Sequence, residues 1–593
     1  MRSANLRRLL AAIWSDPLGR RWLLLSQAAL LGQVVFDLLI PLAIRQIVNN
    51  GILAGNFDKV IKGSLYMAVF SIASMLFATA CAWYAARVGE EVGHRLRTRL
   101  YRRVTELSWG NVDRLETSDL LVRLTTDVNQ VRVMTTSSVT TLLRAPLMIV
   151  GAILVLLWVD VRLALVMLVF LPVVIAVLAF YQLKGAPLYR QVLARFDGLN
   201  QVLQENMAGV RVVQAFVRQD YENARFGREN EGLQKAATAA QSSAAFLNPV
   251  LLLVINLGLA GALWVGGGLV IDGKIELGSV FVLLNYLVAV MIPLILLSVL
   301  LPQMASADSS VGRVVEVLEQ QPEVEEKPGA PTLAVAAGGS VKGRVTFEGV
   351  SFSYLGADGR PNSEPVLSDI DLVAEPGQVV AILGATGSGK STLVNLLARF
   401  YDVTAGRVTI DGVDVRDVTR QSLLETVTPA LQQPSLFSGT IEENLRFGAD
   451  PEKGGLDVVT AARAAEAADF VENRPDGYSG EVKRRGANFS GGQRQRLSIA
   501  RALVRKPRIL VLDDTTSALD VATEARVQDA IRRLMGDSTV FLVAQRISAV
   551  LTADVIVVLD EGRIVAKGAH KELLASSPQY RSIYESQLGP APV

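Results

Sequence analysis

The sequence is poor in the residues that form covalent cross-links and transition-metal sites. It contains one cysteine, Cys81, and two histidines, His94 and His570, among 593 residues. A single cysteine cannot form a disulfide within the chain, and two histidines argue against a histidine-based metal site. The chemistry of this chain is therefore expected to rest on other residue types.

The chain also has little net charge. Its 59 lysines and arginines nearly balance 57 aspartates and glutamates, leaving +2, so no electrostatic attraction to nucleic acid is expected. No small-residue cleavage site follows the first apolar run, so we expect no cleavable signal peptide. Hydrophobic residues, in contrast, make up 50% of the chain, and its mean hydropathy is +0.34. Such a composition is too apolar for an ordinary soluble protein, and the length is too great for one domain.

Six long apolar segments account for the first half of the chain. Each is close to the ~20 residues that a helix needs to cross a membrane, and so many runs do not fit the buried helices of a soluble protein. An arginine-rich amphipathic segment, 1–21, precedes them and is expected to lie along the inner membrane surface. We predict a membrane domain over residues 22–320, with spans near 22–44, 62–86, 139–159, 163–183, 246–270 and 278–301.

The basic residues orient this domain. Residues 87–135 contain nine arginines and residues 184–243 contain eight lysines and arginines, whereas the turns at 160–162 and 271–277 contain one each. By the positive-inside rule the two long loops and the N-terminus are cytoplasmic. Because an even number of spans returns the chain to the cytoplasm, we predict a multi-pass protein of the inner (plasma) membrane with a cytoplasmic C-terminal domain.

Both long loops keep a helical periodicity, which we interpret as membrane helices prolonged into the cytosol. Breaks near 109–111 and 218–220 predict a small helix at each loop tip. Such tips serve either as an intracellular contact surface or only as a solvated hairpin.

Polar residues inside the predicted spans indicate either a wet cavity or contacts between helices. An ionised Asp37 in contact with lipid would cost about 2.5–3.5 kcal/mol, so it should face the bundle or the cavity. Gln33, Asn256 and Asn285 either line the same space or form hydrogen bonds between helices. Arg144 is expected near the inner interface, where its side chain can reach water. Membrane lipid is thus a predicted partner.

A glycine-rich segment in the second half, 384–391, matches a phosphate-binding loop. An apolar run, 379–383, precedes it, and a helical pattern follows. Strand, loop and helix in this order direct backbone N–H groups and a helix N-terminus at phosphate oxygens. Lys390 would reach the phosphates, and Ser391 would ligate Mg²⁺. The expected ATP-binding residues here are Gly384, Ala385, Thr386, Gly387, Ser388, Gly389, Lys390, Ser391 and Thr392.

A change in composition separates the two halves near residue 340. Residues 321–342 are rich in proline, glycine and glutamate and are predicted to be a linker, and residues 343–593 show the patterns of a nucleotide-binding α/β domain. The predicted fold class is an all-α six-helix membrane domain with long cytoplasmic helical extensions, followed by a soluble α/β P-loop ATPase domain.

Two further motifs carry a resemblance to a known family. The strand pattern 508–513 ends in Asp513, a carboxylate suited to Mg²⁺ and its hydration shell, and the segment 488–496 has the sequence NFSGGQRQR. With these motifs the chain resembles the ABC transporter family over nearly its whole length, in the order of an exporter half-transporter. Residues 489–493 resemble the family's signature motif, in which leucine usually stands at the place of Phe489.

This resemblance implies roles for further residues. Tyr354 would stack on adenine, Gln432 would sense Mg²⁺ and the membrane domain, and the loop 517–520 would cross a dimer interface. Two such domains close head to tail around two ATP molecules, each held between the phosphate loop of one chain and the signature motif of the other. ATP and Mg²⁺ are therefore the implied cofactors, and a second half-transporter is the implied partner. Outside the phosphate loop, the implied nucleotide and metal contacts are Tyr354, Gln432, Ser490, Gly491, Gly492, Gln493, Asp513 and Asp520.

Two positions depart from the family pattern. Where the family has a glutamate that acts on the attacking water this chain has Asp514, and where it has a switch histidine this chain has Gln545. Aspartate is one methylene shorter, so its carboxylate falls about 1 Å short, and a misplacement of about 1 Å can cost about 10²-fold in rate. A site with Asp514, Gln545 and Gln432 as its catalytic set should bind ATP and hydrolyse it poorly.

An intact signature beside an impaired hydrolytic pair resembles the degenerate-site subunit of bacterial heterodimeric multidrug ABC exporters. This resemblance implies ATP-driven efflux of hydrophobic or amphipathic small molecules by alternating access. A homodimer would have two impaired sites and little turnover. Two alternatives stay open: an exporter-fold transporter of a specific lipid, peptide or siderophore, and an ATP-gated regulatory membrane protein that does not pump.

Overall fold

The chain forms two units in a computed structural model that describes residues 17–115, 117–356, 360–449 and 455–589. Residues up to Thr105, with Ser118–Gln320, form a membrane unit. Glu106–Thr117 and the residues from Gln321 onward form a soluble unit. Of the predicted membrane-surface segment, residues 1–16 lie outside the described residues, and residues 17–21 begin the first helix.

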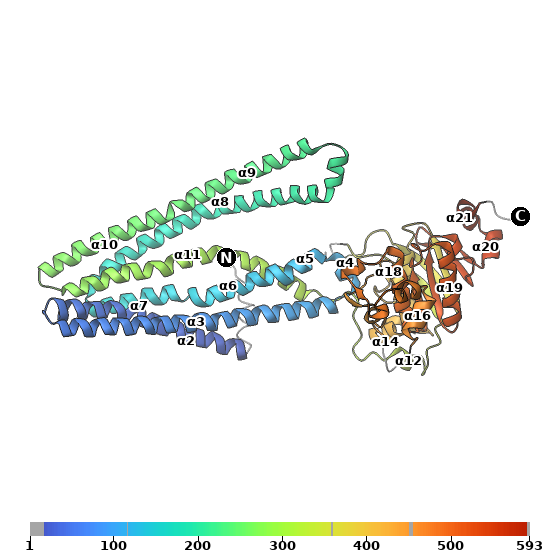
Figure 1. The fold of residues 1–593 in the computed structure, drawn as a ribbon, viewed down its shortest axis with the longest axis horizontal. Helices are drawn as coiled ribbons and strands as arrows, with labels where there is room; N and C mark the ends of the chain where they lie inside the picture. Colours follow the sequence, from blue (N-terminus) through green and yellow to red (C-terminus); the bar gives the residue numbers. More distant parts are fainter. Residues whose placement is uncertain (1–16, 116, 357–359, 450–454, 590–593) are drawn as a thin grey trace. The chain divides into compact units, whose positions relative to one another are not determined.

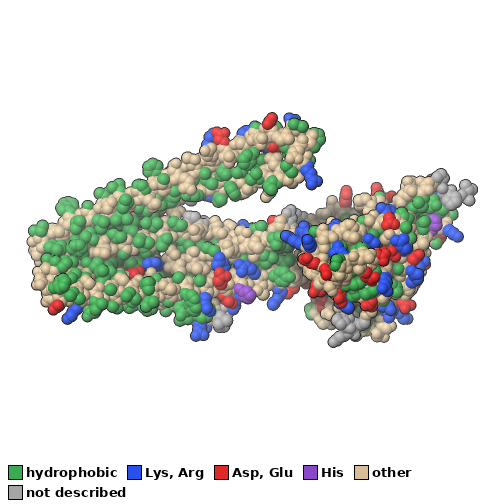
Figure 2. Space-filling model, viewed as in Figure 1, with side chains coloured by type: hydrophobic (Ala, Val, Ile, Leu, Met, Phe, Trp, Pro, Cys, Tyr) green, Lys and Arg blue, Asp and Glu red, His purple; other side chains and the backbone are tan. Residues whose placement is uncertain are grey.

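The membrane unit is helical throughout its described part. Six helical stretches among the described residues are long and apolar enough to cross a membrane, which confirms the predicted six-span architecture. Figure 2 shows hydrophobic side chains covering these helices, with charged side chains gathered toward their ends. The helices (Figure 1) are α2 (Pro17–Gln46), the π-turn η1 (Ile47–Ile52), α3 (Phe57–Glu106), α5 (Thr117–Val122), η2 (Arg123–Asp127), α6 (Val128–Thr141), α7 (Arg144–Val159), α8 (Val161–Ala215), α9 (Gln219–Ala245), α10 (Leu247–Ile271) and α11 (Leu277–Glu319).

Several helices extend far beyond a bilayer. α3 has 50 residues and α8 has 55, and 50 residues span about 75 Å at 1.5 Å per residue, more than twice the hydrocarbon thickness. α8 and α9 pair along their length in an antiparallel hairpin (Figure 1). We predicted a separate small helix at its tip. Helical hydrogen bonding instead continues to Ala215 and resumes at Gln219, and the chain reverses over 216–218, where Val217 adopts a φ of 51°.

Inside the bundle, three of the polar residues singled out in the spans, Asp37, Arg144 and Asn285, have partners. Asp37 accepts a hydrogen bond of 2.5 Å from Ser74, and its second oxygen lies 3.5 Å from the Arg144 guanidinium. Arg144 therefore pairs with a carboxylate of the bundle, a partner that the snorkelling interpretation did not include. Gln33 is buried, and Asn285 donates to the carbonyl oxygen of Phe281 in its own helix.

The soluble unit is built on a six-stranded sheet with the order β12-β11-β3-β10-β9-β6. All neighbouring strands in this sheet are parallel, except that β11 and β12 are antiparallel. β9 and β10 are buried at every position, as expected for parallel strands covered on both faces. The strands are β3 (Val379–Gly384), β6 (Val427–Ala430), β9 (Ile509–Asp513), β10 (Thr539–Ala544), β11 (Val555–Asp560) and β12 (Arg563–Gly568).

Smaller sheets and several helices complete this unit. An antiparallel sheet has the order β2-β1-β4-β5, and β7 pairs with β8. These strands are β1 (Val345–Phe352), β2 (Leu367–Ala374), β4 (Ala405–Ile410), β5 (Val413–Asp414), β7 (Gly439–Thr440) and β8 (Glu481–Val482). The helices are α12 (Leu333–Ala336), α13 (Lys390–Leu397), α14 (Arg420–Thr426), α15 (Ile441–Leu445), α16 (Val458–Ala464), α17 (Ala468–Glu472), α18 (Gly491–Val504), α19 (Val521–Leu534), α20 (His570–Ser576) and α21 (Pro578–Leu588), with 3-10 turns at Val415–Asp417, Gly477–Ser479, Arg484–Gly486 and Ile547–Ala549.

Two segments from outside the predicted domain pack on the soluble unit. Residues of the expected linker contribute to its core, where Leu333 is fully buried, and Pro331 accepts a hydrogen bond from the backbone of Thr419. The first loop tip forms a short helix, α4 (Trp109–Arg114), which also belongs to this unit. The Trp109 ring stacks on Phe400, with centroids 3.9 Å apart and planes 3° from parallel.

Candidate nucleotide-binding site

The candidate site lies where three parallel strands end side by side. In the sheet register, Leu383 of β3 pairs with Ala544 of β10, and Val543 of β10 pairs with Asp513 of β9. The segments that follow these strands therefore emerge at one edge, which is where open α/β sheets bind ligands. They carry the phosphate loop, Asp513 with Asp514, and Gln545.

The phosphate loop is held in a tight conformation that only glycine allows at two positions. Gly389 has a φ of 98° and caps the N-terminus of α13. A Cβ on Gly384 would lie 2.2 Å from the carbonyl oxygen of Leu559, so the loop must approach β11 through its backbone. The buried Ser388 hydroxyl has no hydrogen-bond partner among the described residues. An orphan donor, bare backbone and a helix N-terminus together fit a phosphate group.

Lys390 is buried at the start of α13 and lies over this loop. Its ammonium group donates to the carbonyl oxygens of Gly384 at 2.9 Å and Ala385 at 2.7 Å. Burial lowers the pKa of Lys390, and the nearby carboxylates of Asp514 and Asp513 oppose that shift. The Lys390 ammonium group is thus already positioned at the loop. When phosphate binds, its N–H groups would donate to phosphate oxygens instead of to the loop carbonyls.

Ser391 and Asp513 form a pair suited to a hard divalent cation. The Ser391 hydroxyl donates to Asp513 at 2.8 Å, and burial is the main cause that raises the pKa of Asp513. Among the described residues no group of three His, Cys, Asp or Glu side chains could hold a metal by itself. The pair therefore fits Mg²⁺, which is bound by few protein oxygens together with phosphate and water.

Asp514 and Gln545 meet in the structure. The residue after β9, Asp514, has a φ of 49°, and its carboxylate accepts a 3.0 Å hydrogen bond from the side-chain amide of Gln545 and a 3.4 Å one from Gln432. Burial raises the pKa of Asp514, and the Gln432 hydrogen bond and the Lys390 charge oppose it. The predicted catalytic set is therefore brought together, with two amides directed at one carboxylate.

Tyr354 connects the site to an aromatic group in the soluble unit. Its hydroxyl lies 3.0 Å from the Thr392 hydroxyl of α13, and its ring packs edge-to-face against Phe352 and Tyr401. Burial raises the pKa of Tyr354. A cavity of about 370 Å³ beside it is also lined by Asp113 of α4, whose carboxylate accepts a hydrogen bond from the Tyr401 hydroxyl.

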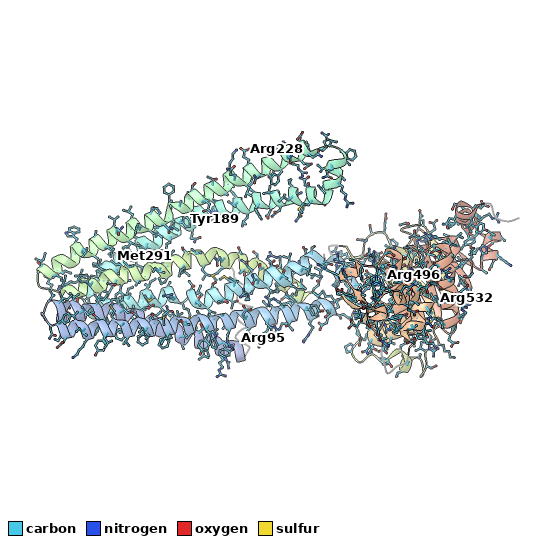
Figure 3. The ribbon with its side chains drawn as sticks, in the orientation of Figure 1. Arg95, Tyr189, Arg228, Met291, Arg496 and Arg532 are labelled. Carbon is cyan, nitrogen blue, oxygen red and sulfur yellow. The ribbon has the colours of Figure 1, made fainter. Side chains whose placement is uncertain are left out.

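The signature segment begins α18 with a capping box. The Ser490 backbone N–H donates to Gln493 Oε1 at 2.9 Å, and the Gln493 N–H donates to the Ser490 hydroxyl at 3.3 Å. Phe489 is buried beneath it, with the Arg474 guanidinium 4.2 Å from its ring. On the same helix, Arg496 (Figure 3) donates to the Glu466 carbonyl oxygen at 2.7 Å. The exposed turn at Ser490 is thus held in place by the capping box and by the contacts of Phe489 and Arg496.

Asp520 starts α19 in a similar way. Its carboxylate accepts a 2.9 Å hydrogen bond from the backbone N–H of Thr523, and this bond lowers the pKa of Asp520. In this chain the carboxylate therefore acts as a helix cap, while its exposed side remains open to another molecule.

Three contributors to the site had no clear sequence signal. Arg546 donates to the carbonyl oxygens of Leu519 at 3.0 Å and Ser517 at 3.1 Å, fixing the loop before α19. Gln495 of α18 accepts from the backbone of Ala518 in the same loop. Gln587 of α21 accepts from the Ile547 N–H at 2.8 Å and donates to the Gln545 carbonyl oxygen at 3.0 Å. A glutamine late in a terminal helix has no motif that could have indicated this contact.

Comparisons with known proteins agree with this architecture. Residues 23–294 match the family model described as ABC transporter transmembrane region, and residues 367–517 match the one described as ABC transporter. The chain is 37% identical over 559 residues to an uncharacterized ABC transporter ATP-binding protein of Mycobacterium tuberculosis, with 93% of each chain covered. It is 34% identical to the ATP-dependent lipid A-core flippase of Syntrophus aciditrophicus, covering 86% of this chain and 83% of the flippase. The structure of a bacterial Atm1-family ABC exporter with ATP bound matches with a TM-score of 0.79 at 26% identity, covering 97% of this chain and 99% of that one.

Proposed function

We propose that this chain is the weakly hydrolysing subunit of a heterodimeric exporter. The premise is that the chain belongs to the ABC transporter family, as an exporter-type half-transporter. The chain is a multi-pass membrane protein whose cytoplasmic ATPase domain is coupled to transport. The finer proposal concerns its own ATP site, its partner and its cargo: hydrophobic or amphipathic small molecules expelled by alternating access.

The observation that carries this proposal is the bonding of Asp514. A general base must reach the attacking water and take its proton. Here one carboxylate oxygen already accepts hydrogen bonds from Gln545 and Gln432, and the side chain is one methylene shorter than glutamate. Gln545 is an amide and cannot exchange a proton near neutral pH. Burial raises the pKa of Asp514, but the Gln432 and Gln545 hydrogen bonds oppose that shift by stabilising the ionised form. With its short reach and one oxygen already bonded, Asp514 is a poor base for the attacking water.

The rest of the site supports ATP binding. Lys390 and the loop around Ser388 would hold the phosphates, and Ser391 with Asp513 would hold Mg²⁺, which neutralises phosphate charge when it is bound. Tyr354, anchored on Thr392, would present its ring to the adenine. These residues orient the nucleotide and exclude water from it. Long-lived ATP at this site would keep two nucleotide-binding domains together between cycles.

The signature segment supports a role toward a second chain. Ser490 is exposed, and the Gly491 N–H lies at the first turn of α18, where a Cβ would meet nothing within 4 Å in this chain. Such a helix start can donate to the γ-phosphate of a nucleotide held by a partner. A competent partner site served by this motif would account for turnover of the pair.

A second candidate function is transport of a lipid. The related protein named ATP-dependent lipid A-core flippase favours it, because 86% of this chain aligns with that protein at 34% identity. A lipid is also an amphipathic molecule, so both candidates predict a cavity that takes apolar cargo from the bilayer. They differ in whether one cargo or many stimulate ATP hydrolysis.

The decisive experiment is purification of the chain from its source cell under mild conditions, followed by native mass measurement and vanadate trapping of nucleotide. The proposal expects a complex with a different half-transporter, and ADP trapped mainly in the partner. A stable, fully active homodimer that traps ADP in both copies would contradict it. Vesicles containing both chains should show ATP-dependent flux of amphipathic dyes, and flux of one lipid alone would select the second candidate.

A further inference from the structure

Four side chains form an aromatic and basic cluster between the N-terminal end of α2 and the middle of α3. The Arg87 guanidinium lies 4.2 Å from the centre of the Trp83 ring and 5.2 Å from that of Trp22. Tyr84 stacks on Trp22 at 5.8 Å and meets Trp83 edge-on at 5.0 Å. Neither the ATP site nor the transport proposal uses this cluster.

The Arg87 guanidinium has no acceptor for its N–H groups among the described residues. The two carboxylates one helical turn further along α3 are already engaged. Glu90 bonds to Arg132 at 2.6 Å, and Glu91 bonds to Arg95 (Figure 3) at 2.5 Å. Within the part of the chain that the structure describes, the Arg87 N–H donors are therefore available to a ligand.

The cluster lies at the level of the cytoplasmic lipid headgroups. In the orientation that the loop charges indicate, α3 begins at Phe57 on the outer side. Trp83 and Arg87 follow 26 and 30 residues later, about 39 and 45 Å along the helix axis. A hydrocarbon core is about 30 Å thick, and the headgroup layers bring the total to about 40–45 Å. Trp22 lies near the cytoplasmic start of α2, next to the exposed Arg20 and Arg21. Trp83 is 50% exposed, so the cluster opens to the surroundings of the bundle.

We propose that this cluster binds the anionic headgroup of a phospholipid in the cytoplasmic leaflet. The free Arg87 donors, with Arg20 and Arg21, would take the phosphate oxygens, since guanidinium groups bind phosphate with paired hydrogen bonds. The rings of Trp22, Trp83 and Tyr84 would lie against the glycerol region, the level that such side chains prefer. A quaternary ammonium headgroup fits less well, because Arg87 already occupies the ring faces that a cation would need.

The test measures lipids bound to the purified complex. The complex is placed in nanodiscs of phosphatidylcholine with one quarter phosphatidylglycerol, and the lipids retained after transfer to detergent are counted by native mass spectrometry. The wild type should retain phosphatidylglycerol in excess of its share. Arg87→Gln should reduce that excess about fivefold, the factor expected for one arginine at an anionic surface, and Arg87→Lys should restore part of it.

Arg97→Gln is the matched control, because Arg97 is an exposed arginine of the same helix that lies further into the cytosol. It should leave the excess unchanged. Equal retention in the wild type and in Arg87→Gln would overturn the proposal. Equal losses in Arg87→Gln and Arg97→Gln would also overturn it, since they would indicate diffuse attraction rather than a site. Trp83→Leu, which keeps an apolar side chain, gives a second measurement if Arg87→Gln does not fold, and it should weaken retention as well.

Discussion

The two sides of the ATP site differ in what their residues are free to do. On the phosphate side, the Ser388 hydroxyl has no partner among the described residues, and Lys390 bonds only to loop carbonyls that a phosphate can replace. On the hydrolytic side, Asp514 accepts from the amides of Gln545 and Gln432, and Gln587 holds the Gln545 backbone. The phosphate side has polar groups free to receive a ligand, whereas on the hydrolytic side one oxygen of Asp514 is already bonded to two amides.

If the proposed weak hydrolysis is right, binding and hydrolysis are separated at one edge of the sheet. Phosphate binding depends on backbone N–H groups and a cation, which tolerate exchange of partners. Water activation depends on the reach and the free lone pairs of one carboxylate, so a single methylene matters. A chain can therefore keep the first and lose the second without changing its fold.

The largest loss of ATPase activity should follow from a change in the signature segment, which belongs to neither side of this chain's ATP site. Ser490→Ala removes a donor that would serve the partner's nucleotide, and loss of one such donor costs on the order of 10²-fold in turnover. Lys390→Ala should cost far less, because Lys390 serves the site that we propose to hydrolyse ATP slowly. The ATPase rate of the purified complex measures both. Asp457→Ala is the control, since it removes an equivalent cap from α16 and should leave turnover nearly unchanged. Equal losses in the Ser490 and Lys390 variants would mean that both sites contribute alike.

Restoring the family's glutamate and histidine on the hydrolytic side should make this chain's ATP site hydrolyse ATP as well as bind it. Asp514→Glu with Gln545→His should raise hydrolysis at this chain's site by about 10²-fold, since the carboxylate regains its reach and the phosphate regains a contact. Either change alone should do less, because groups acting on one transition state are not additive. Vanadate trapping should then label both chains. If the native chain already traps ADP as fast as its partner, the hypothesis that its own site hydrolyses ATP poorly is wrong.

A smaller effect on hydrolysis should follow from removing the hydrogen bond between Gln587 and the Gln545 backbone. In the Asp514→Glu, Gln545→His background, Gln587→Ala should lower the restored trapping about fivefold, the factor for a hydrogen bond of about 1 kcal/mol. ATP affinity should change little, because the hydrogen bonds of Gln587 go to the backbone of Gln545 and Ile547 and not to the phosphate loop, although its side chain lines the same cavity as Gly384 and Ala385. Ser586→Ala, on the same helix and bonded only to Ile583, is the control. An equal drop with Ser586→Ala would indicate a general effect of α21.

An effect of similar size, on local opening instead of turnover, is expected on the phosphate side where Tyr401 bonds to Asp113 of α4. Tyr401→Phe keeps the aromatic packing on Tyr354 and removes the hydrogen bond to Asp113. Amide hydrogen exchange in α4 should rise about fivefold, as expected for a loss of about 1 kcal/mol, while ATP affinity stays the same. Tyr478→Phe removes a long 3.5 Å contact to Glu472 and should change nothing in α4. A fall in ATP affinity with Tyr401→Phe would show that this link also supports the binding side.

The parts of the molecule that local sequence determines could be predicted. A spanning helix needs only its own apolar length, so the six spans follow from hydropathy, and the phosphate loop follows from glycines between a strand and a helix. The cost of a charge in lipid also indicated that Asp37 would face the bundle or a wet cavity.

The contacts that depend on distant segments could not be predicted. Nothing near Arg144 reveals that Asp37 lies within reach, because the pairing depends on how α2 packs beside α7. Helix α8 continues to Ala215 through Gly209, so the local sequence did not indicate where it ends. Gln587 reaches the Gln545 loop only because α21 returns to the edge of the sheet.

The docking of α4 on the soluble unit has a consequence for how the chain is made. Asp113 and its partner Tyr401 are separated by 288 residues, and ribosomes add about 5–20 residues per second. Roughly 15–60 s therefore pass between synthesis of the two residues. Throughout that interval the Trp109 ring lacks Phe400, its stacking partner. The nascent chain thus carries an unpaired aromatic helix in the cytosol until translation is well advanced. Any delay downstream prolongs the time in which chaperones or other nascent chains can bind it.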